Sequence, residues 1–410
     1  MKMYQYSIRD KCRVNTNWDT DIFVGIKCEN GDISVNFPLG YHLEDDEKSL
    51  RKDILLLMNT IKMTTNRKDS EVSRINQNYA KTVFPIQAFL YVVHDYYARG
   101  YYKEREVHYS VSKRGKIDWN KTIKTQKPYM QNGSAYYLDF VTKKNMVNED
   151  EIITLIHEYC VFESFQKIGW LFTASMPAQP RIKFKEKLFR SVIREKIANT
   201  FNDKNRSLFS AMLAIVDYKG CNHDTSNYTF GTYRFEYVWE AMIDKVYGVQ
   251  NKQEYFPKTY WNICGRSIPN ASLEPDTIMV YNNKVYVLDA KYYKYGATKR
   301  PGDLPESTSI NKQITYGEYI VEQEKFQNKY GDSFEVYNAF LMPFDSNANK
   351  EKICDSIIKI GEAYGDWKTN LKKYEKVQGI LIDIKYLMNL FMAHDEDEII
   401  KLVVEIERNM

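Results

Sequence analysis

The segment Leu273–Tyr293 reads LEPDTIMVYNNKVYVLDAKYY, and its pattern determines the fold that we expect for this chain. Two runs rich in β-branched and aromatic residues flank the pair Asn282–Asn283, which predicts a β-hairpin that turns at these asparagines. Side chains alternate between the two faces of a strand, so Asp289 and Lys291 point the same way. Pairing across the hairpin brings Asp276 beside Asp289. The segment therefore predicts two carboxylates and one ammonium group in a single cluster.

Periodic segments on either side of this hairpin predict the rest of the C-terminal half. A helix over 233–247 carries Glu236 and Glu240 on one face, from which one of them can reach the carboxylates. After the hairpin we expect a helix over 309–329, a strand over 336–344, a helix over 350–364, a strand over 378–384 and a helix over 395–408. This order is typical of a mixed α/β fold around one small sheet.

The length of the chain predicts two domains. Its 410 residues exceed the usual size of one domain, and each half is long enough to bury a core. The segment 218–231 is polar and rich in turn residues, so we expect an N-terminal mixed α/β domain at 1–220 and a C-terminal domain at 221–410. A net charge of +4 permits a nucleic-acid partner without arguing for one.

Nothing in the sequence indicates a membrane protein. The N-terminal residues MKMYQYSIRDKCR lack an apolar signal region, and no run of about 18 apolar residues occurs. Six cysteines are scattered without CxxC pairs, which fits reduced and mostly buried thiols. Cys221 and His223 have the spacing of half a zinc site, but no second pair accompanies them. We therefore expect a cytoplasmic protein.

The most basic part of the N-terminal half is the segment 101–130, with eight lysines and arginines against three acidic residues. A turn at 112–116 (SKRGK) separates two expected strands, so its cations project from a loop near several tyrosines and Trp119. Cations interleaved with aromatic rings favour contact with phosphates and base edges, although a solvated charged hairpin explains the same composition. The residues that we expect to touch DNA are Lys113, Arg114, Lys116, Lys121 and Lys124.

Two aspartates beside a lysine suit the metal-assisted hydrolysis of a phosphodiester. Negative charge builds on the non-bridging phosphate oxygens in this reaction, and a divalent cation held by carboxylates offsets that charge. Mg²⁺ prefers a few carboxylate oxygens and water, so the expected ligands are Asp276, Asp289 and the carbonyl of Ala290. Lys291 would orient or deprotonate the attacking water, or stabilise the developing charge. The alternative is an ordinary ion pair between Asp289 and Lys291 on an edge strand.

A family resemblance rests on four pieces of this chain: Glu240, Pro275-Asp276, Asp289-Ala290-Lys291 and Gln313. Together they resemble the core of the PD-(D/E)XK nucleases over about 231–385. The order of GKIDWNKTI at 115–123, FEYVWE at 235–240, the PD and DAKYY motifs and KQxxY at 312–316 is similar to that of LlaJI-type restriction endonucleases. This second resemblance spans most of the chain.

The resemblance implies a Mg²⁺-dependent, site-specific type II restriction endonuclease that acts on double-stranded DNA. The nuclease core would lie at 221–410, and the domain at 1–220 would recognise the site. Glu240 would complete the metal shell or orient a water, and Gln313 would steady the site or touch the DNA backbone. Cutting both strands implies a homodimer or a second restriction subunit. A restriction system also implies a cognate methyltransferase.

Two other roles are compatible with the same residues. The first is a nuclease subunit of a modification-dependent restriction or repair system, which would need an NTP-driven partner because this chain has no P-loop motif. The second is a DNA-binding subunit whose nuclease core is only a scaffold, and the intact acids and lysine argue against it. The methylation state of the cleaved DNA separates the first role from an ordinary restriction enzyme.

Overall fold

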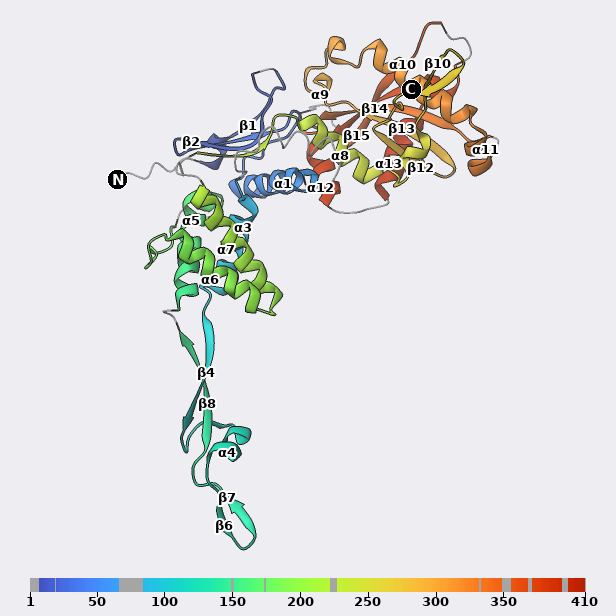
Figure 1. Cartoon of the computed structure of the whole chain (residues 1–410). Coiled ribbons are helices and arrows are strands. Elements are labelled where there is room, and N and C mark those ends of the chain that lie inside the picture. The colour runs from blue at the N-terminus through green and yellow to red at the C-terminus, as the bar shows by residue number, and fades with distance from the viewer. Residues whose placement is uncertain are drawn as a thin grey trace. The chain divides into compact units, whose positions relative to one another are not determined.

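The protein is described by a computed structural model, drawn as a cartoon in Figure 1. It describes residues 7–18, 20–65, 84–148, 151–172, 175–221, 227–331, 333–348, 355–367, 371–392 and 397–409. The chain divides into two compact units: unit 1 consists of 1–81 and 226–410, and unit 2 consists of 82–225. His223, from the half zinc site considered above, lies outside the described residues.

The two units differ from the two predicted domains in one respect. The predicted boundary after residue 220 lies close to the second crossing between the units, but residues 1–81 group with the C-terminal half. The reason is strand pairing, because β9 (Tyr228–Thr232) is antiparallel to β2 (Val24–Glu29). The strand that follows unit 2 thus extends a sheet that begins near the N-terminus. Its order is β1-β3-β2-β9, with β1 at Cys12–Val14 and β3 at Asp32–Phe37.

Within the described residues, the central sheet of unit 1 has five strands in the order β12-β13-β14-β16-β15. Strands β13, β14 and β16 are parallel to one another, and β12 and β15 are antiparallel edge strands. Every residue of β14 is buried, as expected for the central strand of a parallel segment. The bounds are β12 Thr277–Tyr281, β13 Lys284–Ala290, β14 Val336–Phe344, β15 Ile357–Ala363 and β16 Val377–Asp383.

The predicted hairpin is confirmed. Strands β12 and β13 pair from Thr277 opposite Leu288 to Tyr281 opposite Lys284. The turn residues Asn282 and Asn283 have positive φ angles of 47° and 59°, the conformation that a two-residue hairpin turn requires and that asparagine tolerates. Continuing this register by one residue places Asp276 opposite Asp289, as the sequence pattern predicts.

Helices of unit 1 surround this sheet and the N-terminal sheet. Helix α1 contacts both α8 and α12, so the N-terminal part packs on the C-terminal part. Helix α10 ends at Glu322, because Gln323 is extended and separates it from α11. The bounds are α1 Glu47–Thr65, α8 Phe235–Tyr247, α9 Tyr295–Thr298, α10 Ser307–Glu322, α11 Glu324–Tyr330, α12 Ile384–Met392 and α13 Asp397–Glu407, with short 3₁₀ turns η1 Ile8–Lys11, η3 Lys252–Tyr255, η4 Pro301–Asp303 and η5 Lys373–Glu375.

The predicted helix over 350–364 is wrong. Residues 357–363 form β15, which pairs antiparallel with β16 and has an irregularity at Gly361. The isoleucines at the start of this segment are β-branched and suit an edge strand that covers β16. The part at 349–354 lies outside the described residues. The predicted strands over 336–344 and 378–384 are confirmed as β14 and β16, and the predicted helix over 395–408 as α13.

Unit 2 contains a group of helices, a three-stranded sheet in the order β4-β8-β5 and the hairpin β6–β7 (Figure 1). Strands β4 and β8 pair antiparallel over eight residues each, and β5 pairs with β8. Among the described residues, no helix is long and apolar enough to cross a membrane. The bounds are α3 Ile86–Arg99, β4 Glu104–Val111, β5 Lys116–Ile117, α4 Trp119–Thr125, β6 Tyr129–Gln131, β7 Ser134–Tyr136, β8 Val141–Asn148, α5 Ile152–Ile168, η2 Gly169–Leu171, α6 Glu186–Asn199 and α7 Asp203–Cys221.

Helix α10 lies very close to the sheet at Gly317. A methyl group added there would come within 2.6 Å of the Tyr374 side chain and 2.9 Å of Asn338 Nδ2. Asn338 donates to the carbonyl oxygen of Tyr374, so these neighbours hold each other in place. Buried apolar side chains, among them Tyr316 and Ile320, join α10 to the strands at the same interface. Glycine at 317 therefore sets the distance between α10 and β14.

The variant Gly317→Ala is expected to destabilise unit 1 by about 1–3 kcal/mol, because overpacking outweighs the gain of about 1 kcal/mol that alanine brings to a helix. Thermal or urea denaturation of the purified chain measures the change. Gly302→Ala is the matched control, since a methyl group there meets no atom within 4 Å. Equal stability of the two variants would show that α10 can shift away from the sheet without cost.

Candidate active site

The predicted acidic residues come together where β13 ends and β12 begins. Because these strands are antiparallel, the end of one and the start of the other lie at the same edge of the sheet. The Asp276 carboxylate accepts a hydrogen bond from the backbone N–H of Ala290 at 2.9 Å. The carboxyl group of Asp289 neighbours that of Asp276 closely enough to share a hydrogen bond with it. We call Asp276, Asp289 and Lys291 the carboxylate cluster.

Lys291 completes this cluster as a cation. Its Nζ lies 2.7 Å from Oδ2 of Asp289, whose side chain is almost fully buried. Burial alone would lower the pKa of Lys291, but the charges of Asp289 and Asp276 raise it above its ordinary value. The lysine is therefore an ammonium group at neutral pH. Such a group can donate hydrogen bonds to a water or a phosphate oxygen, whereas removing a proton from water would require its neutral form.

The pKa of Asp276 is raised well above its ordinary value. Burial is the largest cause, followed by the neighbouring carboxylate of Asp289, and the charge of Glu240 adds to both. The hydrogen bond from Ala290 acts in the opposite direction, because it favours the ionised form. The charge of Asp289 opposes the ionisation of Asp276, and a bound cation would relieve this opposition.

The donor set of the cluster fits Mg²⁺. Magnesium takes one or two carboxylates from a protein and keeps several waters, and Asp276 and Asp289 supply that pair. In the part of the chain that the structure describes, no three His, Cys, Asp or Glu side chains are grouped so that they could hold a metal by themselves. A closed structural zinc site, which needs four such ligands, therefore does not fit these residues.

Helix α8 contributes one acid to the surroundings of the cluster. Glu240 lies near enough for its charge to raise the pKa of Asp276. Glu236, one turn earlier, forms an ion pair with Arg234. Trp239 fixes the helix, because its buried indole N–H donates to the carbonyl oxygen of Leu341 at 3.1 Å. Of the two candidates on this helix, Glu240 is therefore the one whose charge acts on Asp276.

One carbonyl group of β14 connects these parts. The oxygen of Leu341 accepts the Trp239 indole N–H and also the backbone N–H of Lys291, at 2.9 Å. The first bond holds α8 and the second holds the residue that follows β13. The helix that carries Glu240 and the backbone of Lys291 are therefore held at the same point of the sheet.

Gln313 of α10 lies behind the cluster and is 1% exposed. Its Nε2 donates to the carbonyl oxygens of Val287 at 3.2 Å and Ala339 at 3.3 Å, so it bridges β13 and β14. Its Oε1 has no hydrogen-bond partner among the described residues. Of the two roles expected for Gln313, steadying the site agrees with this burial, and contact with a DNA backbone would need an exposed side chain.

Tyr316 is a neighbour of the cluster that the sequence pattern named only as part of a family motif. Its ring is buried, and its hydroxyl group has no hydrogen-bond partner among the described residues. Burial raises the pKa of Tyr316, and the charges of Asp289 and Asp276 raise it further. Tyr316 comes three positions after Gln313 and therefore lies on the same face of the helix. This spacing is the sequence signal that could have placed Tyr316 near the cluster.

The N-terminal part of unit 1 supports the segment after Lys291, and no sequence pattern indicated this. The hydroxyl oxygen of Tyr292 accepts the backbone N–H of Leu39 at 2.7 Å, and Asn17 Nδ2 donates to the carbonyl of Tyr292 at 3.3 Å. Lys294 Nζ lies 3.5 Å from the ring centre of Trp18. Residues more than 250 positions away in the chain therefore hold the backbone that follows Lys291.

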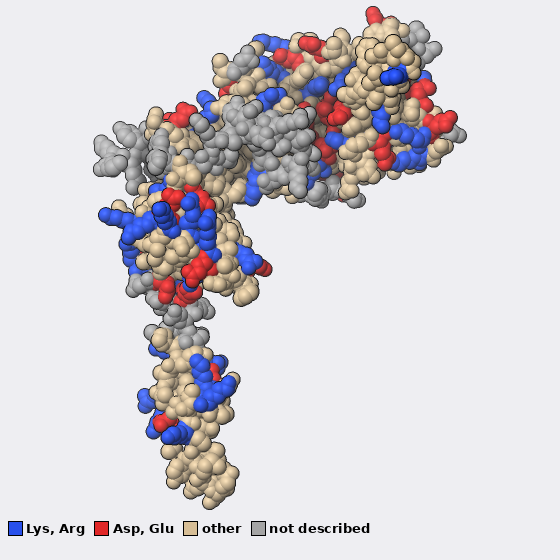
Figure 2. Space-filling view, in the orientation of Figure 1, with Lys and Arg blue, Asp and Glu red and all other residues tan. Residues whose placement is uncertain are grey.

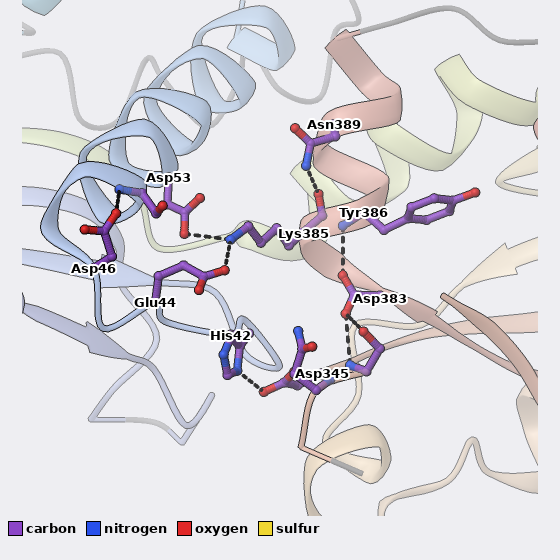
Figure 3. A network of polar contacts seen from close by, with 12 residues as sticks. His42, Glu44, Asp46, Asp53, Asp345, Asp383, Lys385, Tyr386 and Asn389 are labelled. Atoms are coloured by element: carbon purple, nitrogen blue, oxygen red, sulfur yellow. Dashed lines mark hydrogen bonds and ion pairs between the residues drawn. The ribbon is translucent and has the colours of Figure 1, made fainter. Parts of the chain in front are cut away.

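A second polar network lies at the ends of β14 and β16, on the same edge of the sheet as the cluster (Figure 3). Lys385 Nζ contacts Glu44 at 2.8 Å and Asp53 at 2.9 Å. His42 lies 3.3 Å from a carboxylate oxygen of Asp345. Every one of these contacts joins the N-terminal part to a residue that follows a parallel strand. The network is a further attachment of residues 42–53 to the sheet.

The predicted DNA-binding residues belong to unit 2 and are exposed. Lys121 Nζ lies 3.1 Å from the ring centre of Tyr109, so one of the expected pairs of cation and aromatic ring is present. Figure 2 shows Lys and Arg side chains on this part of unit 2 in separate small groups, with uncharged surface between them. The positions are Lys113 and Arg114 in the turn after β4, Lys116 in β5, and Lys121 and Lys124 in α4.

The variant Asp276→Asn is expected to stabilise the metal-free chain at neutral pH. Folding raises the pKa of this carboxyl group above the ordinary aspartate value of about 4. At a pH above that value the group ionises more readily in the unfolded chain than in the folded chain, and this difference lowers the stability of the fold. Asparagine carries no charge and keeps an oxygen for the Ala290 N–H. We expect a gain of about 1 kcal/mol at about pH 8 that vanishes toward about pH 3. Thermal melting across this range, without divalent metal, measures it; a variant that melts below the wild type at the higher pH would contradict the pKa direction.

Comparison with known proteins places these residues in a family. Residues 23–360 match the family model described as LlaJI restriction endonuclease. The chain is 27% identical over 337 residues to the type II restriction enzyme BsuMI component YdjA of Bacillus subtilis (strain 168), and the match covers 76% of this chain and 67% of that relative.

A solved structure also shows a distant likeness. A chain of the refined half-complex from the tetradecameric assembly of Thermococcus gammatolerans McrB AAA+ hexamers with bound McrC is 14% identical, with a TM-score of 0.38 over 93% of this chain and 83% of that chain. At this TM-score the likeness does not bear on the fold or the function. The family match, in contrast, spans most of the sequence, and this protein belongs to the LlaJI restriction endonuclease family.

Proposed function

We propose that this chain is a Mg²⁺-dependent, site-specific DNA endonuclease of a restriction system, and that the carboxylate cluster cuts the phosphodiester bond. The observation that carries the proposal is the pair Asp276 and Asp289, held side by side at the sheet edge with the Lys291 ammonium group against them. Membership of a restriction endonuclease family supports a nuclease role. An acid directly before β12, a second acid in β13 and a further acid on a flanking helix support a PD-(D/E)XK core.

The residues of the cluster have separate roles in this proposal. Asp276, Asp289 and the carbonyl of Ala290 would hold Mg²⁺, with Glu240 at the side of Asp276. The ion, when bound, would offset the charge on the phosphate and lower the pKa of a water molecule. Lys291 would donate hydrogen bonds to the attacking water or to a phosphate oxygen. Gln313 would keep β13 and β14 together and thereby preserve the position of Asp289.

The variants Asp289→Ala and Lys291→Ala are expected to reduce cleavage of plasmid DNA in Mg²⁺ by at least about a hundredfold, because each removes a group that acts on the developing charge. Circular dichroism checks that both variants are folded. Glu240→Gln and Glu236→Gln form a matched pair on one helix, of which only the first should lower cleavage. Undiminished cleavage by Asp289→Ala or Lys291→Ala would refute the proposed site.

A partner subunit belongs to the proposal as well. The relative from Bacillus subtilis is named as a component of a type II restriction enzyme, so we propose that this chain acts with a second restriction subunit or as a homodimer. A cognate methyltransferase would protect the host DNA. The alternative is the nuclease subunit of a modification-dependent or repair system with an NTP-driven partner. Cleavage of methylated DNA alone, dependent on such a partner, would favour this alternative.

We further propose that the basic residues of unit 2 bind double-stranded DNA. All five are exposed, and they lie on the β4–β5 turn, β5 and α4. Arginine in such a turn can pair bidentately with guanine, and lysine more often meets phosphate. A chain that binds DNA through these residues but has an inert cluster would be a non-catalytic DNA-binding subunit. The intact acids and lysine of the cluster argue against that role.

The double variant Lys113→Ala/Arg114→Ala is expected to bind DNA more weakly and with a shallower dependence on salt, the slope falling by about one for each phosphate that is no longer neutralised. Fluorescence anisotropy with a labelled duplex at several salt concentrations measures both quantities. Lys48→Ala, an exposed lysine of α1 in unit 1, is the control. If the double variant keeps the slope of the wild type, these two residues do not contact DNA.

A further inference from the structure

The β-hairpin β10–β11 exposes an apolar face that nothing in the described residues covers. Strand β10 (Tyr260–Ile263) pairs antiparallel with β11 (Arg266–Pro269), and every residue of both strands is exposed. The register places Trp261 opposite Ile268 and Ile263 opposite Arg266, so these four side chains share one face. Trp261 is 64% exposed, Ile263 52% and Ile268 46%. A two-stranded ribbon of this kind gains little stability from its own contacts.

A short segment of the chain joins the base of this hairpin to the carboxylate cluster. Its two ends are joined by a hydrogen bond from Leu273 N–H to the Pro257 carbonyl at 2.9 Å, and the chain then reaches Asp276 within three residues. The turn η3, before the hairpin, also contacts this point, because Lys252 Nζ donates to the Asp276 carbonyl at 2.7 Å. Both strands of the ribbon are therefore anchored next to a residue of the cluster.

The charge of the ribbon favours a polyanion over a protein surface. The segment 257–273 contains Lys258 and Arg266 and no acidic residue. Arg266 makes no ion pair with any described residue, and its neighbours across the ribbon are apolar. An apolar face with an unpaired arginine near its turn suits base edges and phosphates, where thymine methyl groups meet apolar side chains and arginine meets guanine or phosphate.

We infer that the β10–β11 ribbon enters the major groove of the DNA beside the bond that is cut. Two paired strands lie about 5 Å apart, and with their side chains they fit a groove about 12 Å wide. Because the scissile phosphate must reach Asp276, DNA bound there passes the base of the ribbon. The inference rests on the proposed nuclease function and adds to it an element that holds and reads DNA at the cut, in unit 1 and separate from the basic residues of unit 2.

The test measures binding of a pool of labelled duplexes of mixed sequence to the full chain in metal-free buffer. Trp261→Ala is expected to weaken binding about tenfold without changing the salt slope, because it removes an uncharged base contact. Arg266→Ala is expected to weaken binding and to lower the slope by about one. Trp367→Ala and Arg408→Ala are the matched controls, because both side chains are more than half exposed. Both residues lie in segments next to β15, which is the edge strand farthest from β12.

A second measurement uses the wild-type chain and follows the accessibility of the ribbon. Cys264 in the turn is exposed, so its rate of alkylation by a maleimide, followed by peptide mass spectrometry, should fall when duplex DNA is added. Unchanged affinity, slope and alkylation in the ribbon experiments would overturn the inference, as would a wild-type chain that does not bind DNA. The inference would also be overturned if the ribbon variants bound DNA normally but altered the oligomeric mass of the protein in solution. The ribbon would then be a contact between copies of the chain.

Cleavage of plasmid DNA by the wild type, measured in parallel, separates this inference from the nuclease proposal. Cleavage in Mg²⁺ together with unaffected ribbon variants would leave the nuclease proposal intact and remove the ribbon from the DNA interface. Binding that depends on Trp261 and Arg266, without any cleavage, would retain the ribbon as a DNA contact and reject the catalytic role of the cluster.

Discussion

The repulsion between two neighbouring carboxylates is the constraint on which the site depends. The antiparallel register of β12 and β13 places Asp276 opposite Asp289, and burial makes the negative charge of Asp276 costly. The surroundings offset this cost with the Lys291 ammonium group and the Ala290 N–H. A folded chain keeps such an arrangement only where the rest of the structure is stable enough to hold it.

The stability that keeps the two carboxylates together comes from β14 and the helices packed against it. One backbone carbonyl, that of Leu341, holds both α8 and the residue after β13. Gln313 bridges two strand carbonyls from α10, and Gly317 allows that helix to approach. Because β14 is buried throughout, it cannot move without disturbing the whole core. The acids and the lysine are thereby attached to a strand that is buried along its whole length.

Local signals in the sequence predicted the parts of the site that lie close together in the chain. The asparagine turn and the alternation of Asp289 and Lys291 were sufficient to predict the hairpin and its cluster. The helical spacing of residues over 233–247 was sufficient to predict α8. The segment at 357–363 was misread because an edge strand with its own irregularity lacks a clear period. The contacts of Leu39 and Asn17 with Tyr292 join residues more than 250 positions apart, and one sequence contains no signal for such a pairing.

Unit 1 is discontinuous, and this affects the order in which the protein can be completed during translation. Residues 1–81 emerge from the ribosome before unit 2, but their sheet gains β9 and their polar network gains Lys385 only after all of unit 2 has been made. Since domains fold largely as they emerge, unit 2 can fold while unit 1 is still incomplete. A nascent chain therefore has no assembled carboxylate cluster until β12, β13 and β14, which all follow unit 2, have been synthesised.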